Sequence, residues 1–179
     1  MPPRTPNAGS AGYSQVQDRG RCIPMNGDLE YLPVPAPALD RIRCNDHDDY
    51  GNSLIAQSSG AGAPLRCCLR MSTEGEQIAL IAYQPSPLGG PYAEIGPVFI
   101  HVDECSGPAL SGFPLDFLDR RAVLRPYDAA GLMLDGVLAE PGTSEGELKR
   151  LFDDPAVELV HVRNVIAGCW NFSVRRSVG

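Results

Sequence analysis

The stretch that decides the fold is the C-terminal run Val157-Glu-Leu-Val-His-Val-Arg-Asn-Val-Ile-Ala-Gly-Cys-Trp-Asn-Phe-Ser-Val-Arg175. Apolar and polar residues alternate along two arms, which are separated by a turn within residues 164–168. This alternation is typical of β-strands with one buried face, because successive side chains point to opposite faces of a sheet. The stretch therefore predicts an antiparallel hairpin, and it contains the only Trp of the chain together with His161 and Cys169.

The predicted hairpin has one apolar face and one polar face. The apolar face is formed by Val160, Val162, Trp170, Phe172 and Val174. The polar face is formed by His161, Arg163, Cys169, Asn171 and Ser173. In the expected register Cys169 lies opposite Arg163, and Asn171 lies opposite His161. Such a polar face is either a half-solvated edge of the sheet or the floor of a pocket.

This polar face is the candidate functional site of the chain. Its leading interpretation is a binding site for a small molecule or a protein, and the residues expected to contact the ligand are Arg163, Asn164, Asn171, Arg66 and Arg125. The alternative is a cysteine-dependent enzyme with Cys169 as the nucleophile and His161 as its base, because a neighbouring cation lowers the pKa of a thiol. Structural packing of the same residues is a further alternative.

A transition-metal site is the third hypothesis. His101 and Cys105 are separated by an even step, and a strand would place both on one face, where His161 and Cys169 could complete a tetrahedral zinc site. The chain has six cysteines but no C-x-x-C motif, so most of them are expected to be small buried side chains. We therefore assign no metal ligands and no cofactor from the sequence.

Composition and charge exclude several classes of protein. The net charge of −7 and the pI of about 4.9 argue against a nucleic-acid-binding face, which requires clustered basic residues. No apolar run reaches the roughly 18–20 residues that a membrane span needs. The N-terminus has no apolar segment typical of a signal peptide. We therefore expect a soluble cytoplasmic protein with reduced cysteines, which contacts neither nucleic acid nor membrane.

The chain is expected to contain one α+β domain, preceded by a flexible arm over residues 1–27 and an extended or loop lead-in over residues 28–63. Within the core domain, residues 64–179, runs of strands predict a mostly antiparallel sheet built from hairpins. The expected hairpins pair residues 65–71 with 77–83, 122–127 with 132–138, and the two arms of the C-terminal stretch. Two short helices are expected at residues 114–120 and 144–152.

Three local patterns have conventional interpretations. In the second predicted helix, Ser144 and Glu147 have the spacing of an N-terminal capping box. The acidic segment at residues 45–50 is expected to be a loop that faces water. Arg66, Arg70 and Arg125 could form an anion pocket with the backbone at Gly89-Gly90, but ion-paired arginines at the surface are the more conventional interpretation.

An ordered series of short motifs resembles a bacterial family known as domain of unknown function 1203. The motifs are Pro64-Leu-Arg-Cys-Cys-Leu, Gly75-Glu, Gly90-Pro-Tyr, Gly96-Pro-Val-Phe-Ile, Arg125-Pro-Tyr-Asp-Ala-Ala-Gly with Met133 and Asp135, His161-Val-Arg-Asn and Gly168-Cys-Trp. The resemblance covers residues 64–175 and implies no activity. This chain has Leu65 and Arg163 where the family often has Cys and His, which argues against metal ligands at those two positions.

Overall fold

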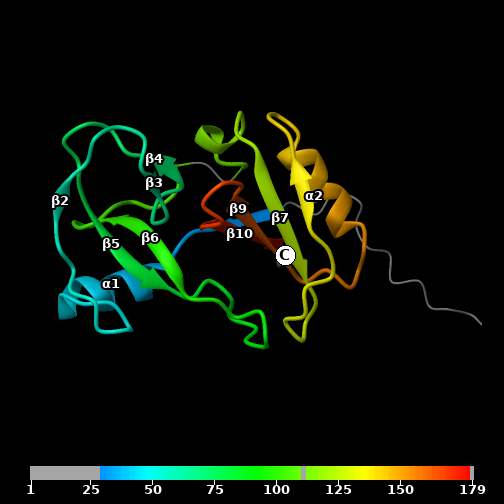
Figure 1. Cartoon of the computed structure of the whole chain (residues 1–179), viewed down its shortest axis with the longest axis horizontal. Coiled ribbons are helices and arrows are strands. Elements are labelled where there is room, and N and C mark those ends of the chain that lie inside the picture. Colours follow the sequence, from blue (N-terminus) through cyan, green and yellow to red (C-terminus); the bar gives the residue numbers. More distant parts are fainter. Residues whose placement is uncertain (1–28, 110–111, 178–179) are drawn as a thin grey trace, which may run out of the picture.

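The computed structural model describes residues 29–109 and 112–177, so the predicted N-terminal arm lies outside the described residues. The described strands form two five-stranded sheets that lie side by side (Figure 1). The first sheet has the order β1 (Leu29–Leu32), β10 (Trp170–Arg176), β9 (Leu159–Asn164), β7 (Ala122–Tyr127) and β8 (Val137–Ala139). The second has the order β2 (Gln57–Ser58), β5 (Gln77–Tyr83), β6 (Gly96–His101), β3 (Pro64–Leu65) and β4 (Arg70–Met71).

Neighbouring strands are antiparallel except for β3 and β6, which run parallel with Leu65 opposite Phe99. The α+β prediction with mostly antiparallel pairing is therefore confirmed, but the strands are divided between two sheets. The C-terminal hairpin is present as β9 and β10, and the hairpin of β7 with β8 is also formed.

One apolar face of the first sheet builds much of the hydrophobic core. Its residues Val160, Val162 and Val174 are at most 1% exposed. Helix α2 (Ser144–Phe152) lies beside β7 and β8 in Figure 1 and buries Leu148, Leu151 and Phe152. Their spacing places these apolar side chains on one face of the helix, and burial of that face stabilises the helix more than intrinsic propensity does.

The predicted hairpin of residues 65–71 with 77–83 is wrong. A tight turn over residues 66–69 interrupts the first arm, with Leu69 in the left-handed region at φ 56°, and the chain folds back so that β4 pairs with β3. Strand β5 instead pairs with β6 along its whole length, across the irregular loop of residues 84–95. A seven-residue strand gains far more ladder hydrogen bonds from β6 than the two-residue β4 could provide.

The lead-in contains a helix that the sequence analysis did not predict, α1 (Ala36–Asn45). Prolines at 33, 35 and 37 indicated extended chain, but proline is also compatible with the first turn of a helix, where its missing N–H is not needed. Leu39 and Ile42, three residues apart, are buried and attach the helix to the core.

The two predicted helices after residue 110 differ in detail from the expectation. The first is only a 3-10 turn, η1 (Leu115–Phe117). The second has the expected bounds, but Thr143 occupies the N-cap position and makes no side-chain cap hydrogen bond. The predicted capping box is therefore absent, and the Ser144 hydroxyl is buried inside the first turn without a hydrogen-bond partner.

The acidic segment at residues 45–50 does not simply face water, because Asp48 is only 1% exposed. Its carboxylate accepts hydrogen bonds from the backbone N–H groups of Tyr50, Asn52 and Ala82 at 2.7–2.9 Å. The Ala82 contact attaches this loop to β5. Asp48 therefore has a structural role, since a buried carboxylate requires such donors.

Candidate functional site

The register of the C-terminal hairpin differs from the predicted one. A bulge between Trp170 and Phe172 shifts the pairing, so that Trp170 lies opposite Arg163 and Ser173 lies opposite His161. Trp170 therefore belongs to the face of His161 rather than to the apolar face, and its Nε1 donates a hydrogen bond of 3.0 Å to the Ser173 hydroxyl. The predicted pairs of Cys169 with Arg163 and of Asn171 with His161 are not formed.

The candidate residues of the polar face have separate partners. The Sγ atom of Cys169 is a weak donor to the Ala167 carbonyl at 3.8 Å. Asn171 accepts a hydrogen bond from Arg66, and the Asn164 side chain accepts from the backbone of its own turn. His161 is 2% exposed and neither ring nitrogen has a hydrogen-bond partner. In the described part of the chain, no hydrogen bond connects Cys169 with His161.

Burial, together with the charge of nearby Arg163, lowers the pKa of His161 from 6.5 to about 4. Between these values the unfolded chain binds a proton at this position and the folded chain does not. The free energy of unfolding should therefore fall by about 3 kcal/mol as the pH is lowered from about 6.5 to about 4. Urea titrations at several pH values should show this slope in the wild type and lose it in His161→Gln. An equal slope of unfolding free energy against pH in both proteins would contradict the lowered pKa of His161, because the two proteins share all other titrating groups.

Four potential metal ligands meet at another place, the end of the second sheet: Cys67, Cys68, His101 and Cys105. The parallel pairing of β3 with β6 explains why. Both strands run in the same direction, so the turn that follows β3 lies beside the end of β6. That turn holds the two adjacent cysteines, His101 is the last residue of β6, and Cys105 is in the segment that follows.

The donor atoms of the four residues all lie within 4.8 Å of one another. Cys67 Sγ is 3.9 Å from Cys68 Sγ, and His101 Nδ1 is 3.4 Å and 3.8 Å from these two sulfur atoms. For tetrahedral zinc with ordinary bond lengths, sulfur atoms are separated by about 3.8 Å, and sulfur and nitrogen by about 3.5 Å. Cys67, Cys68 and His101 are therefore arranged at nearly the spacing that a tetrahedral metal ion requires, and Cys105 Sγ lies within 4.8 Å of their donor atoms.

A backbone N–H group donates to one of the three sulfur atoms, that of His101 to Cys67 Sγ at 3.3 Å. The backbone N–H groups of Arg70 and Gly107 act in the direction that lowers the pKa of Cys68 and of Cys105, respectively. Such donors stabilise thiolate, which is the form that binds metal. The hydrogen bond with Cys67 lowers the pKa of Cys68 and raises that of Cys67, whereas burial raises the pKa of Cys105.

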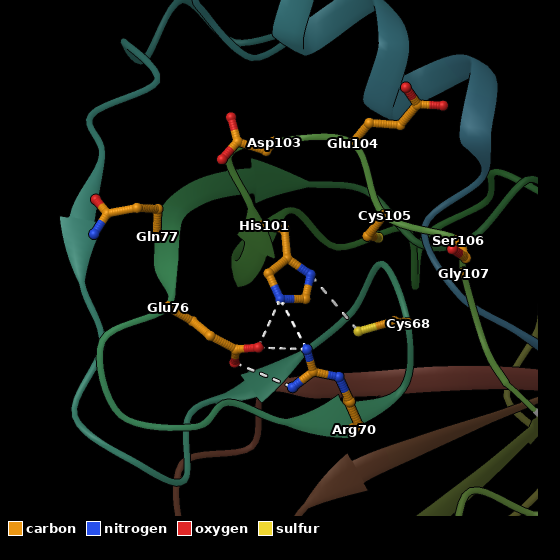
Figure 2. Close-up of a pocket in the computed structure, with 10 residues that line it drawn as sticks. All are labelled: Cys68, Arg70, Glu76, Gln77, His101, Asp103, Glu104, Cys105, Ser106 and Gly107. Atoms are coloured by element: carbon orange, nitrogen blue, oxygen red, sulfur yellow. Dashed lines mark hydrogen bonds and ion pairs between the residues drawn. The ribbon is translucent and has the colours of Figure 1, made fainter.

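A carboxylate and a guanidinium surround the far side of the imidazole (Figure 2). His101 Nε2 is 3.6 Å from Glu76 Oε1 and 3.2 Å from Arg70 Nη2. Arg70 also donates to both carboxylate oxygens of Glu76 and, more than any other group, lowers the pKa of Glu76 to about 2. Because a guanidinium can only donate, the contact with Arg70 uses the Nε2 lone pair and places the imidazole proton on Nδ1, toward the thiols. A metal ion at Nδ1 would require the proton to lie on Nε2 instead, where the Glu76 carboxylate is the nearby acceptor.

The cluster lies at the wall of a pocket of about 460 Å³. Cys68, His101 and Cys105 line the pocket, whereas Cys67 lies behind them and is 1% exposed. Figure 2 shows Asp103 and Glu104 on the same segment as Cys105, at the rim of the pocket. A metal ion could therefore reach the cluster from solvent without unfolding of the sheet.

Two of the four residues, His101 and Cys105, are among those that the sequence hypothesis of a metal site names as ligands, but their predicted partners are wrong. His101 and Cys105 were grouped with His161 and Cys169, whereas the structure places them beside Cys67 and Cys68. The adjacent cysteines gave no motif signal because their spacing is not C-x-x-C. Nothing in the local sequence brings the two cysteines to His101, because their contact depends on the parallel pairing of Leu65 in β3 with Phe99 in β6, which are 34 positions apart.

Fold and cluster together define the molecule as an α+β protein with a Cys3His cluster at the edge of its second sheet. The chain belongs to the family of proteins of unknown function DUF1203, whose family model matches residues 62–176 and thus more than half of the chain. All four cluster residues lie within the matched region. No curated protein and no solved structure matches the chain. Within the described residues, no helix is long and apolar enough to cross a membrane.

Proposed function

We propose that this protein binds one transition-metal ion, zinc in preference, through Cys67, Cys68, His101 and Cys105. The observation that carries the proposal is the convergence of four donor atoms within 4.8 Å of one another. Tetrahedral sites of three thiolates and one imidazole are a standard zinc environment. Soft thiolate ligands disfavour magnesium and calcium, which prefer oxygen.

The number of ligands favours a structural or regulatory metal over a catalytic one. Catalytic zinc sites usually have three protein ligands and one water, whereas closed sites have four protein ligands. The five cysteines in the described part of the chain are free thiols, and thiolate ligation requires a reducing environment. This supports a cytoplasmic location, and the acidic net charge of −7 supports partners other than nucleic acid.

Metal analysis of protein purified without chelator tests the proposal. We expect about one equivalent of zinc per chain. After zinc removal, reconstitution with cobalt(II) should give the intense visible bands of a tetrahedral site and a sulfur-to-cobalt charge-transfer band in the near ultraviolet. Substoichiometric metal and a spectrum of six-coordinate cobalt would refute the proposal.

The carboxylate of Glu76 should tune the affinity of this site. Glu76→Gln preserves the shape of the side chain but removes the charge 3.6 Å from Nε2 of His101, which would accept the Nε2 proton once Nδ1 binds a metal ion. Loss of such an outer partner typically weakens metal binding by about 10–100-fold. Competition for zinc with a chromophoric chelator measures the change.

Glu140→Gln is the matched control for Glu76→Gln. It removes a carboxylate that pairs with Arg121 on the first sheet and should leave the zinc affinity unchanged. If Glu76→Gln binds zinc as tightly as this control, the carboxylate does not orient His101.

A further inference from the structure

A second cluster lies on the polar face of the first sheet and is independent of the metal ligands. Arg125 on β7 lies opposite His161 on β9, and Arg163 is two residues further along β9. Because strand side chains alternate, the three side chains share one face. Glu94, from the irregular loop of residues 84–95, reaches over this face.

Glu94 is shared between the two arginines. Its Oε1 is 3.1 Å from Arg125 Nη1, and its Oε2 is 2.5 Å from Arg163 Nη2. Neither arginine has another ion-pair partner in the described part of the chain, so two cations share one anion. The Arg163 side chain is only 11% exposed, and the hydrogen bond from its Nε to the Gly168 carbonyl fixes its orientation.

His161 remains without a hydrogen-bond partner beside this pair. Both of its ring nitrogens are buried and unpaired, and one side of the ring packs against Tyr127 at a centroid distance of 4.8 Å. Buried polar groups are almost always paired with protein or water, so this exception requires an explanation. Each oxygen atom of Glu94 contacts one arginine, and neither oxygen is hydrogen-bonded to the imidazole.

We infer that Arg125, Arg163 and His161 form a binding site for the phosphate group of a small molecule, and that Glu94 occupies this site as an internal substitute. Phosphate carries up to two charges and therefore compensates both arginines. It also has enough oxygen atoms to accept from both guanidinium groups and from an N–H of His161. Arginine is suited to this role because its planar fork matches the geometry of phosphate oxygens.

The loop that carries Glu94 packs against the first sheet and places this side chain beside the two arginines. Glu94 itself is 44% exposed, and the loop contacts the turn after β7 through backbone atoms at Gly89 and Gly131. A side chain at Gly131 would lie 2.6 Å from the Gly89 carbonyl, and both glycines have positive φ. The loop also contacts β7 through Tyr92, whose ring centroid is 6.3 Å from that of Tyr127. A ligand therefore has to replace the half-exposed Glu94 side chain and not the whole loop.

Isothermal titration calorimetry with inorganic phosphate and with phenyl phosphate tests the inference. Glu94→Gln removes the competing charge and should bind phosphate at least about tenfold more tightly than the wild type. Adding Arg163→Gln should abolish this binding, and adding His161→Phe should weaken it by about tenfold through loss of one hydrogen bond. Tighter binding of phenyl phosphate than of inorganic phosphate identifies a phosphate monoester as the ligand class, and the reverse order identifies free phosphate.

Glu30→Gln is the matched control, because Glu30 is 43% exposed and forms one ion pair with Arg175 on the same sheet. This variant should bind phosphate no better than the wild type. If Glu94→Gln also gains no phosphate binding, or gains no more than Glu30→Gln, then Glu94 forms an ion pair only and the inference is wrong. The test is distinct from that of the metal centre, since it uses no metal and none of the four cluster residues.

Discussion

Replacing Cys105 by serine is expected to abolish stoichiometric zinc binding and to lower the stability of the protein by about 4 kcal/mol or more in the presence of zinc. A ligand that binds only the folded chain stabilises it by about 4 kcal/mol at a thousandfold excess over its dissociation constant. Structural zinc sites bind more tightly than this condition requires. Cys105 is chosen because it lies outside the strands and is only partly buried, so serine is tolerated there when no metal is bound.

The measurement is a thermal or urea unfolding curve of wild type and Cys105→Ser, each with zinc and with excess chelator. With zinc the variant should be much less stable than the wild type, whereas with chelator the two proteins should be nearly equal. The stability deficit of the variant with zinc, minus its deficit with chelator, measures the contribution of the metal separately from the packing of the side chain.

Cys169→Ser is the matched control for Cys105→Ser. Cys169 is a partly exposed thiol in the turn between β9 and β10, and its weak contact is the Ala167 carbonyl. The control should retain one zinc per chain and wild-type stability under both conditions. If Cys105→Ser has the same deficit with and without chelator, the residue acts through packing and the metal proposal fails.

The parts of the fold that could be predicted are those whose signal is local. Alternation along residues 159–176 identified β9 and β10, and the apolar spacing of Leu148, Leu151 and Phe152 identified α2 with its observed bounds. In α2 the apolar spacing is also the pattern of burial, whereas β9 and β10 are buried on both faces, including the polar residues His161, Asn171 and Ser173. Helix α1 was missed because its flanking prolines are compatible with both an extended segment and a first helical turn.

The candidate sites could not be predicted because they depend on pairings that the local pattern does not contain. A bulge adds one residue to β10 without disturbing the alternation on either side, so nothing indicated that Trp170 changes face. The metal cluster requires the parallel contact of Leu65 with Phe99. The phosphate-site hypothesis likewise depends on Glu94, which lies in a loop and has no periodicity to interpret.

Replacing Arg66 by methionine is expected to destabilise the protein by about 3 kcal/mol, because this side chain connects the two sheets. Arg66 was a candidate ligand-binding residue, but it is 3% exposed. Its Nε donates to the Trp170 carbonyl at 2.9 Å, its Nη2 donates to Asn171 Oδ1 at 3.2 Å, and its Nη1 donates to the Pro64 carbonyl. Burial lowers its pKa to about 10, so the guanidinium remains charged at neutral pH.

Methionine preserves most of the apolar stem but leaves the Trp170 carbonyl and the Asn171 side chain buried without donors. Each unpaired buried group costs about 1–3 kcal/mol, which is the physical basis of the expected loss. Arg66→Lys should recover only part of the stability, since a single ammonium group cannot reach acceptors on both β10 and the Pro64 strand with the geometry of a guanidinium.

Arg121→Met is the matched control for Arg66→Met, since the Arg121 side chain is 52% exposed and pairs with Glu140 at the surface. Loss of such a pair costs about 0–1 kcal/mol. Urea titrations should be carried out with excess chelator, because Arg66 precedes the proposed ligand Cys67 and its loss also disturbs the turn of residues 66–69. If Arg66→Met is destabilised under these conditions by no more than the control, Arg66 does not hold the sheets together. If stability is lost only in the samples that contain zinc, Arg66 stabilises the protein only by supporting the turn that holds Cys67 and Cys68.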